Sequence, residues 1–122
     1  MTLKAHAGRL RVHALACELA ADAVRLARTF RGPGSYERGD QLVRAALSIC
    51  SNIAEACGRG TVTEFRRFLV YARGSAQETL TQLRVAAALD PANAQAFHAL
   101  ENRVALVLKM LGRLIAHPPP DR

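Results

Sequence analysis

Four runs of apolar residues recur every three to four positions along this chain, and short links containing Gly or Pro separate them. This spacing lines one face of an α-helix. The clearest run alternates steps of three and four without a break, through Phe97, Leu100, Val104, Val107, Leu111 and Leu114. Such a heptad seam is typical of helices that pack with nearly aligned axes. We therefore expect an all-α protein.

The links divide the chain into four expected helices, at about 9–31, 38–57, 62–89 and 91–116. Thr61 and Glu64 form a capping-box pattern before the third helix, and Asp90 followed by Pro91 predicts an N-cap before the fourth. Because the links are short, consecutive helices must run antiparallel. The sequence therefore predicts one domain over residues 1–122, an up-down-up-down four-helix bundle with short disordered ends.

Several polar side chains and one glycine fall on or beside the faces of the second and third helices that should be buried. Desolvated polar groups require partners, so we predict that these residues fix helix register and subunit packing. Glu55 is expected to pair with an arginine, namely Arg44, Arg59 or Arg73. Gly74 lies inside a helix, where glycine costs about 1 kcal/mol against alanine, which indicates the close approach of another backbone. The full set is Arg44, Ser48, Asn52, Glu55, Gly74, Ser75 and Glu78.

No pattern of reactive residues typical of an enzyme is present. The histidines lack HxxxH or HExxH spacing, no Glu-x-x-His occurs, no serine lies in GxSxG, and the Gly/Arg loop at 58–60 lacks the residues of a P-loop. We therefore predict a non-enzymatic protein without catalytic, cofactor-binding or metal-binding residues.

The cysteines and the hydropathy pattern indicate a cytoplasmic protein. Cys17, Cys50 and Cys57 lack CxxC spacing and are interpreted as reduced thiols that serve as small apolar side chains. We expect no signal peptide, because no apolar run follows the basic N-terminal residues. No stretch of 18 uninterrupted apolar residues exists, so no membrane association is expected.

Basic residues outnumber acidic ones by seventeen to ten, and fifteen of the basic residues are arginines. This excess has two interpretations: a compositional bias toward Arg, or a surface that binds a polyanion. The second predicts salt-sensitive contacts to the RNA or DNA backbone. Only Tyr36 and Tyr71 are expected to be exposed aromatics, which argues against reading of single-stranded bases. The arginines expected to contact nucleic acid are Arg25, Arg28, Arg31, Arg59, Arg66, Arg67 and Arg73.

The segment from Gln41 to Glu78 also resembles a known family. Gln41-Leu-x-Arg44-Ala-Ala-x-Ser48-Ile followed by Asn52-Ile-Ala-Glu55 is similar to the signature of the four-helix bundle proteins encoded in 23S ribosomal RNA intervening sequences. Further matching pieces are Phe30-x-x-Pro33, Glu64-Phe65-x-x-Phe-Leu, Ala72-x-Gly74-Ser75 and Glu78. The resemblance covers about residues 10 to 115. Ala56 departs from the family's usual glycine, which predicts that the second helix continues to Gly58.

The resemblance implies an antiparallel bundle that assembles into a ring-like homopentamer. It also implies a distant similarity to the accessory variability determinant of diversity-generating retroelements, a basic pentamer that works with a reverse transcriptase and nucleic acid. Our hypothesis is a homo-oligomer that binds structured RNA through arginines. The alternative is a protein-interaction scaffold, such as a reverse-transcriptase accessory subunit. A small metal-oxidase bundle, the third class considered, would contain iron.

Overall fold

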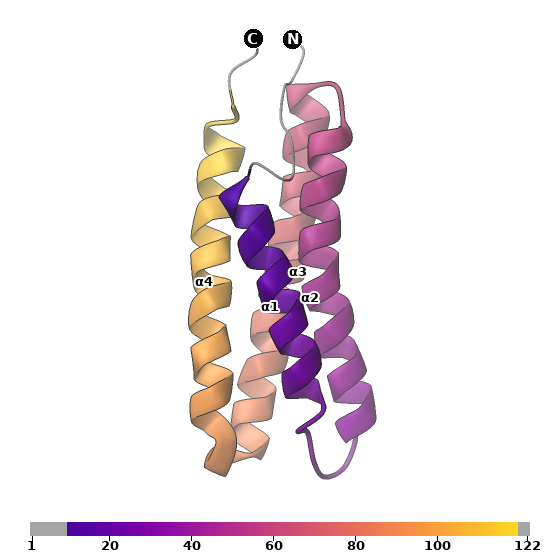
Figure 1. Cartoon of the computed structure of the whole chain (residues 1–122), viewed down its shortest axis with the longest axis vertical. Coiled ribbons are helices and arrows are strands. Elements are labelled where there is room, and N and C mark those ends of the chain that lie inside the picture. Colours follow the sequence, from indigo (N-terminus) through magenta and orange to yellow (C-terminus); the bar gives the residue numbers. More distant parts are fainter. Residues whose placement is uncertain (1–9, 120–122) are drawn as a thin grey trace.

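The computed structural model describes residues 10–119, and within this range the chain forms four α-helices and no strand. The helices are α1 (Arg11–Ala27), α2 (Ser35–Gly58), α3 (Val62–Leu89) and α4 (Ala94–Ala116). Consecutive helices run in opposite directions, so the topology is up-down-up-down (Figure 1). The predicted all-α antiparallel bundle is confirmed. Most of the expected disordered ends, and residue 9, lie outside the described residues.

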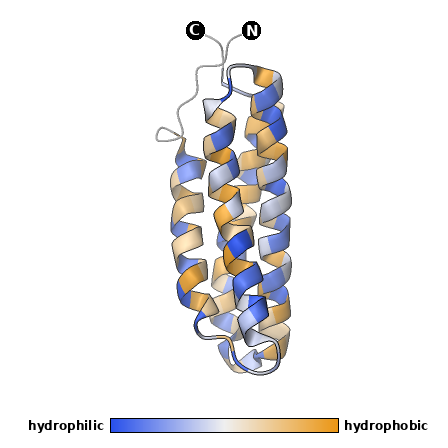
Figure 2. Ribbon diagram, turned by 90° about the vertical axis from the view of Figure 1, so that its right-hand side faces the viewer, coloured by the Kyte–Doolittle hydropathy of each residue, from blue (hydrophilic) through white to orange (hydrophobic). Residues whose placement is uncertain are grey.

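The apolar stripes meet in one interior core. In α4 the predicted heptad seam is buried from Phe97 to Leu111, and Leu114 is half-buried at its end. Hydrophobic and hydrophilic residues alternate around each helix, as amphipathic helices require (Figure 2). Within residues 10–119 Thr79 is the one fully buried polar residue, and its hydroxyl donates to the Ser75 carbonyl oxygen at 2.8 Å.

Helix α1 ends at Ala27, four residues before the expected end. The chain turns there because the Phe30 ring packs edge-on against Phe97, with centroids 5.8 Å apart. Gly32 and Gly34 then adopt φ values of 83° and 69°, which side chains other than glycine rarely adopt. The apolar contact and the two glycines together break the helical pattern that the sequence suggested.

Helix α2 begins at Ser35, about three residues before the expected start. The segment 28–34 between α1 and α2, which we call the linker, is held by Arg38 in the first turn of α2. The Arg38 guanidinium donates to the carbonyl oxygens of Arg31 (2.8 Å) and Pro33 (3.4 Å). Its Nε is buried without a hydrogen-bond partner in the described part of the chain. At the other end α2 extends to Gly58, which confirms the expectation drawn from Ala56.

The two remaining helix starts differ from the expected caps. The Thr61 hydroxyl accepts from the Glu64 amide at 3.2 Å, but the Glu64 carboxylate binds Arg67 instead of completing the capping box. The predicted side-chain cap from Asp90 is absent from the described structure; its carboxylate accepts from the Asn93 side chain at 2.8 Å. A short 3₁₀ helix, η2 (Pro91–Asn93), therefore precedes α4.

Candidate nucleic-acid interface

Three residues of the predicted polar set meet between α2 and α3. The Ser48 and Ser75 hydroxyls are 2.8 Å apart and share a hydrogen bond. The Asn52 amide donates to the carbonyl oxygen of Ser48 at 2.9 Å and to its hydroxyl at 3.0 Å. All three side chains are half-buried, so they join the two helices in one register. We call this group the polar seam.

The charged members of the predicted set lie outside the polar seam. Arg44 pairs with Asp40 at 2.9 Å, and Glu78 is exposed. Glu55 pairs with Arg59 at 2.5 Å, which selects one of its three expected partners. The ion pair between Glu55 and Arg59 joins residues four apart at the C-terminal end of α2 and lies on the surface. Such exposed pairs contribute little to stability.

Gly74 does not fill the role expected within the chain. It is exposed, and a Cβ placed on it would meet no atom within 4 Å. Within the described chain no other backbone therefore approaches Gly74, and the expected close approach stays a prediction about contacts with another chain. The glycine that does meet a neighbouring helix is Gly39, whose added Cβ would lie 3.4 Å from both the Cβ and the carbonyl oxygen of Ala27.

The arginines are best described by the half of the bundle in which they lie. We define the terminal half as residues 10–18, 48–75 and 106–119, which includes the α2–α3 turn, and the linker half as residues 19–47 and 76–105 (Figure 1). The terminal half carries seven Arg or Lys residues against three carboxylates, whereas the linker half carries seven against six. The cations of the terminal half are Arg11, Arg59, Arg66, Arg67, Arg73, Lys109 and Arg113.

Two terminal-half arginines lie against an aromatic cluster. The guanidinium carbon of Arg59 is 4.6 Å from the centroid of Phe68, and that of Arg67 is 5.4 Å from it. Arg67 also lies 5.8 Å from the centroid of Tyr71, whose ring packs edge-on against Phe68. Cation–π contacts of this kind hold a guanidinium flat against a ring, and each of these two arginines also pairs with a carboxylate, Arg59 with Glu55 and Arg67 with Glu64. Tyr71 remains 47 % exposed, as the sequence predicted.

The other two predicted arginines of this half lie on a different face of α3. The Nε of Arg66 donates to the Ile115 carbonyl oxygen at 2.9 Å and so satisfies an acceptor at the end of α4. Arg73, two helical turns later, is exposed on the same face. Arg66 and Arg73 therefore lie apart from the aromatic cluster that holds Arg59 and Arg67. Lys109 and Arg113 of α4, which the sequence did not single out, belong to the same half, and Arg113 lines a groove with Arg11 at the start of α1.

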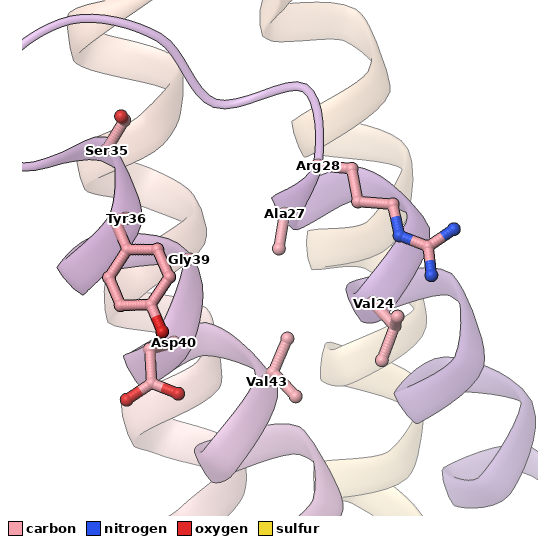
Figure 3. Close-up of a pocket in the computed structure, with 8 residues that line it drawn as sticks. All are labelled: Val24, Ala27, Arg28, Ser35, Tyr36, Gly39, Asp40 and Val43. Carbon is pink, nitrogen blue, oxygen red and sulfur yellow. The ribbon is translucent and has the colours of Figure 1, made fainter.

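The linker-half arginines are balanced by acids. Arg25 pairs with Asp22 at 2.8 Å. Arg28 lines a groove of about 310 Å³ between α1 and α2, across from Tyr36 and Asp40 (Figure 3). Arg31 contributes its backbone carbonyl to Arg38. These arginines are exposed, but the surrounding carboxylates weaken the field that they present.

Across the bundle, α4 is tied to α1 by an ion pair that the sequence did not reveal. Arg103 hydrogen-bonds Asp22 and also lies 3.6 Å from Glu18. The hydrogen bond from Arg103 lowers the pKa of the Asp22 carboxyl below its usual 3.8, although partial burial opposes this shift. The residues come from positions far apart in the chain, so no local spacing could identify them.

The structure shows no candidate metal site among the described residues. Between residues 10 and 119, no three His, Cys, Asp or Glu side chains come together as a metal site would require. None of the helices in this range has the length and apolarity needed to cross a membrane.

The comparisons with known proteins agree with this architecture. A family model described as 23S rRNA-intervening sequence protein matches residues 8–113. The chain belongs to the 23S rRNA-intervening sequence protein family.

A crystal structure of a protein of unknown function from the S23 ribosomal protein family of Bacteroides thetaiotaomicron is similar, with a TM-score of 0.76 and 22 % identity. The match covers 85 % of this chain and 97 % of that one, and it supports the fold. No curated protein matches the chain. Neither the family description nor that structure indicates an enzyme.

Proposed function

We propose that this protein is a non-enzymatic, self-assembling bundle that binds structured RNA through its terminal half. The observation that carries the proposal is the unequal charge of the two halves. The terminal half contains seven Arg or Lys residues and three carboxylates, whereas the linker half contains seven and six. A field of one sign attracts the phosphate backbone. The family description supports RNA as the polyanion, because it associates the family with 23S rRNA intervening sequences.

Within the terminal half, the exposed cations divide by role. Arg67, Arg73 and Arg113 are exposed and suited to contact phosphate oxygens. Arg66 is engaged with the end of α4 and positions that helix instead. Tyr71 adds a face on which an unpaired base can stack. Phosphate contacts carry no base information, so the binding would be largely independent of sequence and sensitive to salt.

The test compares two triple variants that remove equal charge. The first is Arg67→Gln, Arg73→Gln and Arg113→Gln in the terminal half, and the matched control is Arg25→Gln, Arg28→Gln and Arg31→Gln in the linker half. Affinity for a fluorescent RNA hairpin is measured by anisotropy over a series of salt concentrations. The terminal-half variant should lose about one unit of salt slope per phosphate contact removed, while the control should retain nearly the whole slope.

Three results would contradict this proposal. Equal losses in both variants would show that overall charge, and not the terminal half, controls binding. Affinity that does not change with salt would exclude phosphate contact. Cleavage of the RNA during the assay would contradict a non-enzymatic role. Purification with a stoichiometric protein partner, such as a reverse transcriptase, and without nucleic acid would favour the scaffold alternative.

Self-assembly is supported by the outer face of α3. Val70, Gly74, Thr81 and Val85 are exposed at helical spacing, and Val70 and Val85 are large apolar residues in water. A bare glycine within such a face lets a second backbone approach closely. We propose that this face of α3 packs against another copy of the chain in the predicted homopentamer.

Light scattering tests the assembly. The wild-type protein should have a mass that is a multiple of the chain mass, and Gly74→Arg should reduce it because the guanidinium occupies the space of the approaching helix. Leu106→Glu, at an exposed apolar position of α4, serves as the matched control and should leave the mass unchanged. A wild-type monomer, or an unchanged mass in Gly74→Arg, would contradict this part of the proposal.

A further inference from the structure

The facing sides of α1 and α2 form a seam of small residues. Gly39 of α2 lies against Ala27 of α1, at the 3.4 Å given above. One step further along, Val24 and Val43 lie on opposite sides of the same groove (Figure 3). Small side chains along such a seam allow two helix axes to come close together.

Counting along this seam brings two cysteines to one level. Cys17 is one heptad before Val24 in α1, and Cys50 is one heptad after Val43 in α2. Because the helices are antiparallel, both steps lead about 10.5 Å in the same direction and return to the same facing sides. The buried alanines at 20 and 46 lie between the two levels and keep the helices close there.

The surroundings of the two thiols differ. Cys17 is exposed, and its sulfur lies 3.7 Å from a ring nitrogen of His13. Cys50 is half-buried and its thiol donates to the Leu47 carbonyl oxygen at 3.1 Å. Burial raises the pKa of the Cys50 thiol, and the neighbouring Cys17 thiol adds to the increase. The exposed thiol beside an imidazole is the one open to attack from solvent, whereas the second thiol is kept protonated behind it.

We propose that Cys17 and Cys50 are a redox-active pair that a hydroperoxide converts into a disulfide between α1 and α2. The Cys17 sulfur attacks the peroxide oxygen, His13 accepts the thiol proton, and the leaving oxygen departs as water or an alcohol, which leaves a sulfenic acid. The Cys50 sulfur then attacks the sulfenic sulfur and expels water. Two thiols thus give two electrons to one peroxide. A small thiol of the glutathione class reduces the disulfide by exchange.

Cys57 provides an internal control. It lies two turns beyond Cys50 on α2 and is half-buried, and burial raises the pKa of its thiol. No other cysteine lies at its level in the described part of the chain. Replacing it leaves one cysteine on each side of the seam, so any intramolecular disulfide in a Cys57→Ser protein must join Cys17 to Cys50.

The experiment treats the Cys57→Ser protein with hydrogen peroxide under native conditions. The expected product is a chain without free thiols and without a covalent link to another chain, in which mass spectrometry finds the tryptic peptides 12–25 and 45–59 joined by a bond that a reductant breaks. Its thermal midpoint should rise, because the new link restricts the unfolded chain. Adding Cys50→Ser should abolish the link and leave a sulfenic acid on Cys17 that dimedone traps.

Three outcomes with the Cys57→Ser protein would overturn the inference. In the first, peroxide leaves both thiols of the Cys57→Ser protein free; in the second, it oxidises Cys17 to sulfinic acid without a link; in the third, it produces only disulfides between separate chains. Each would mean that the two thiols do not meet across the seam. In the wild-type protein, a link from Cys57 to either partner would lead to the same conclusion.

Discussion

The α2–α3 pair and the α1–α4 pair are held together in different ways. Between α2 and α3, short polar side chains bond inside the interface, with the Ser48 and Ser75 hydroxyls in contact and Asn52 beside them. Between α1 and α4, long charged side chains meet at the surface, where Arg103 reaches Asp22. A groove of about 440 Å³ opens beside this ion pair. The first pair has one fixed register, whereas the second can shift without losing a buried hydrogen bond.

The comparison predicts unequal costs for the same truncation in the two pairs. Leu42→Ala in α2 removes a side chain with no exposed surface and should lower the free energy of unfolding by about 2–5 kcal/mol. Leu26→Ala in α1 removes a half-buried side chain from the wall of the groove. Its cost should be smaller, because less new cavity is created. Urea unfolding measures both, and equal costs would remove the distinction between the pairs.

The polar seam should show coupling that surface serines lack. Ser75→Ala leaves the Ser48 hydroxyl without one partner and should cost about 1 kcal/mol of unfolding free energy. In a double-mutant cycle with Ser48→Ala, the interaction energy should be about 0.5–1.5 kcal/mol. Ser51→Ala, on the exposed side of α2, is the control and should change stability by less than about 0.5 kcal/mol. An interaction energy near zero would show that the two serine hydroxyls do not stabilise each other.

The smallest expected effect concerns the surface ion pair and its pH dependence. The pKa of Asp22 is lowered in the folded state, so its contribution is present at pH above 3.8 and is lost as the pH falls through the lowered value. Asp22→Asn should therefore cost a few tenths to about 1 kcal/mol at neutral pH, since the pair is partly exposed, and nothing at the acid limit. Unfolding free energies of both proteins between pH 2 and pH 6 measure this convergence. Curves that stay parallel would show that Asp22 does not act through its charge.

The sequence predicted those features that depend on local spacing. Apolar periodicity identified four helices, and Ser48, Asn52 and Ser75 stood out because each interrupts a buried face. The predicted end of the first helix was wrong because the expected range included Phe30, whose ring packs instead against Phe97 of α4. For Gly74 the sequence could not say which chain supplies the close backbone, because a glycine in a helix indicates a contact without identifying its partner.

The charge pattern required three dimensions. Arg66 and Arg67 are adjacent in sequence but serve different surfaces, since one turns toward the end of α4 and the other toward Phe68. Arg103 and Asp22 meet only because α4 returns alongside α1. The concentration of cations in the terminal half arises from segments far apart in the chain, so a linear count of Arg and Glu could not reveal it.

Because the bundle has four antiparallel helices, α1 begins and α4 ends at the same end of the bundle, which affects where the protein can be labelled. Leu10 and Leu114 line one groove, so the start of α1 and the end of α4 are neighbours at the pole opposite the linker (Figure 1). A tag or surface tether attached at either end would therefore crowd the basic half and obstruct a large ligand. A dye on the linker near Gly34, at the far pole, would report binding without standing in its way.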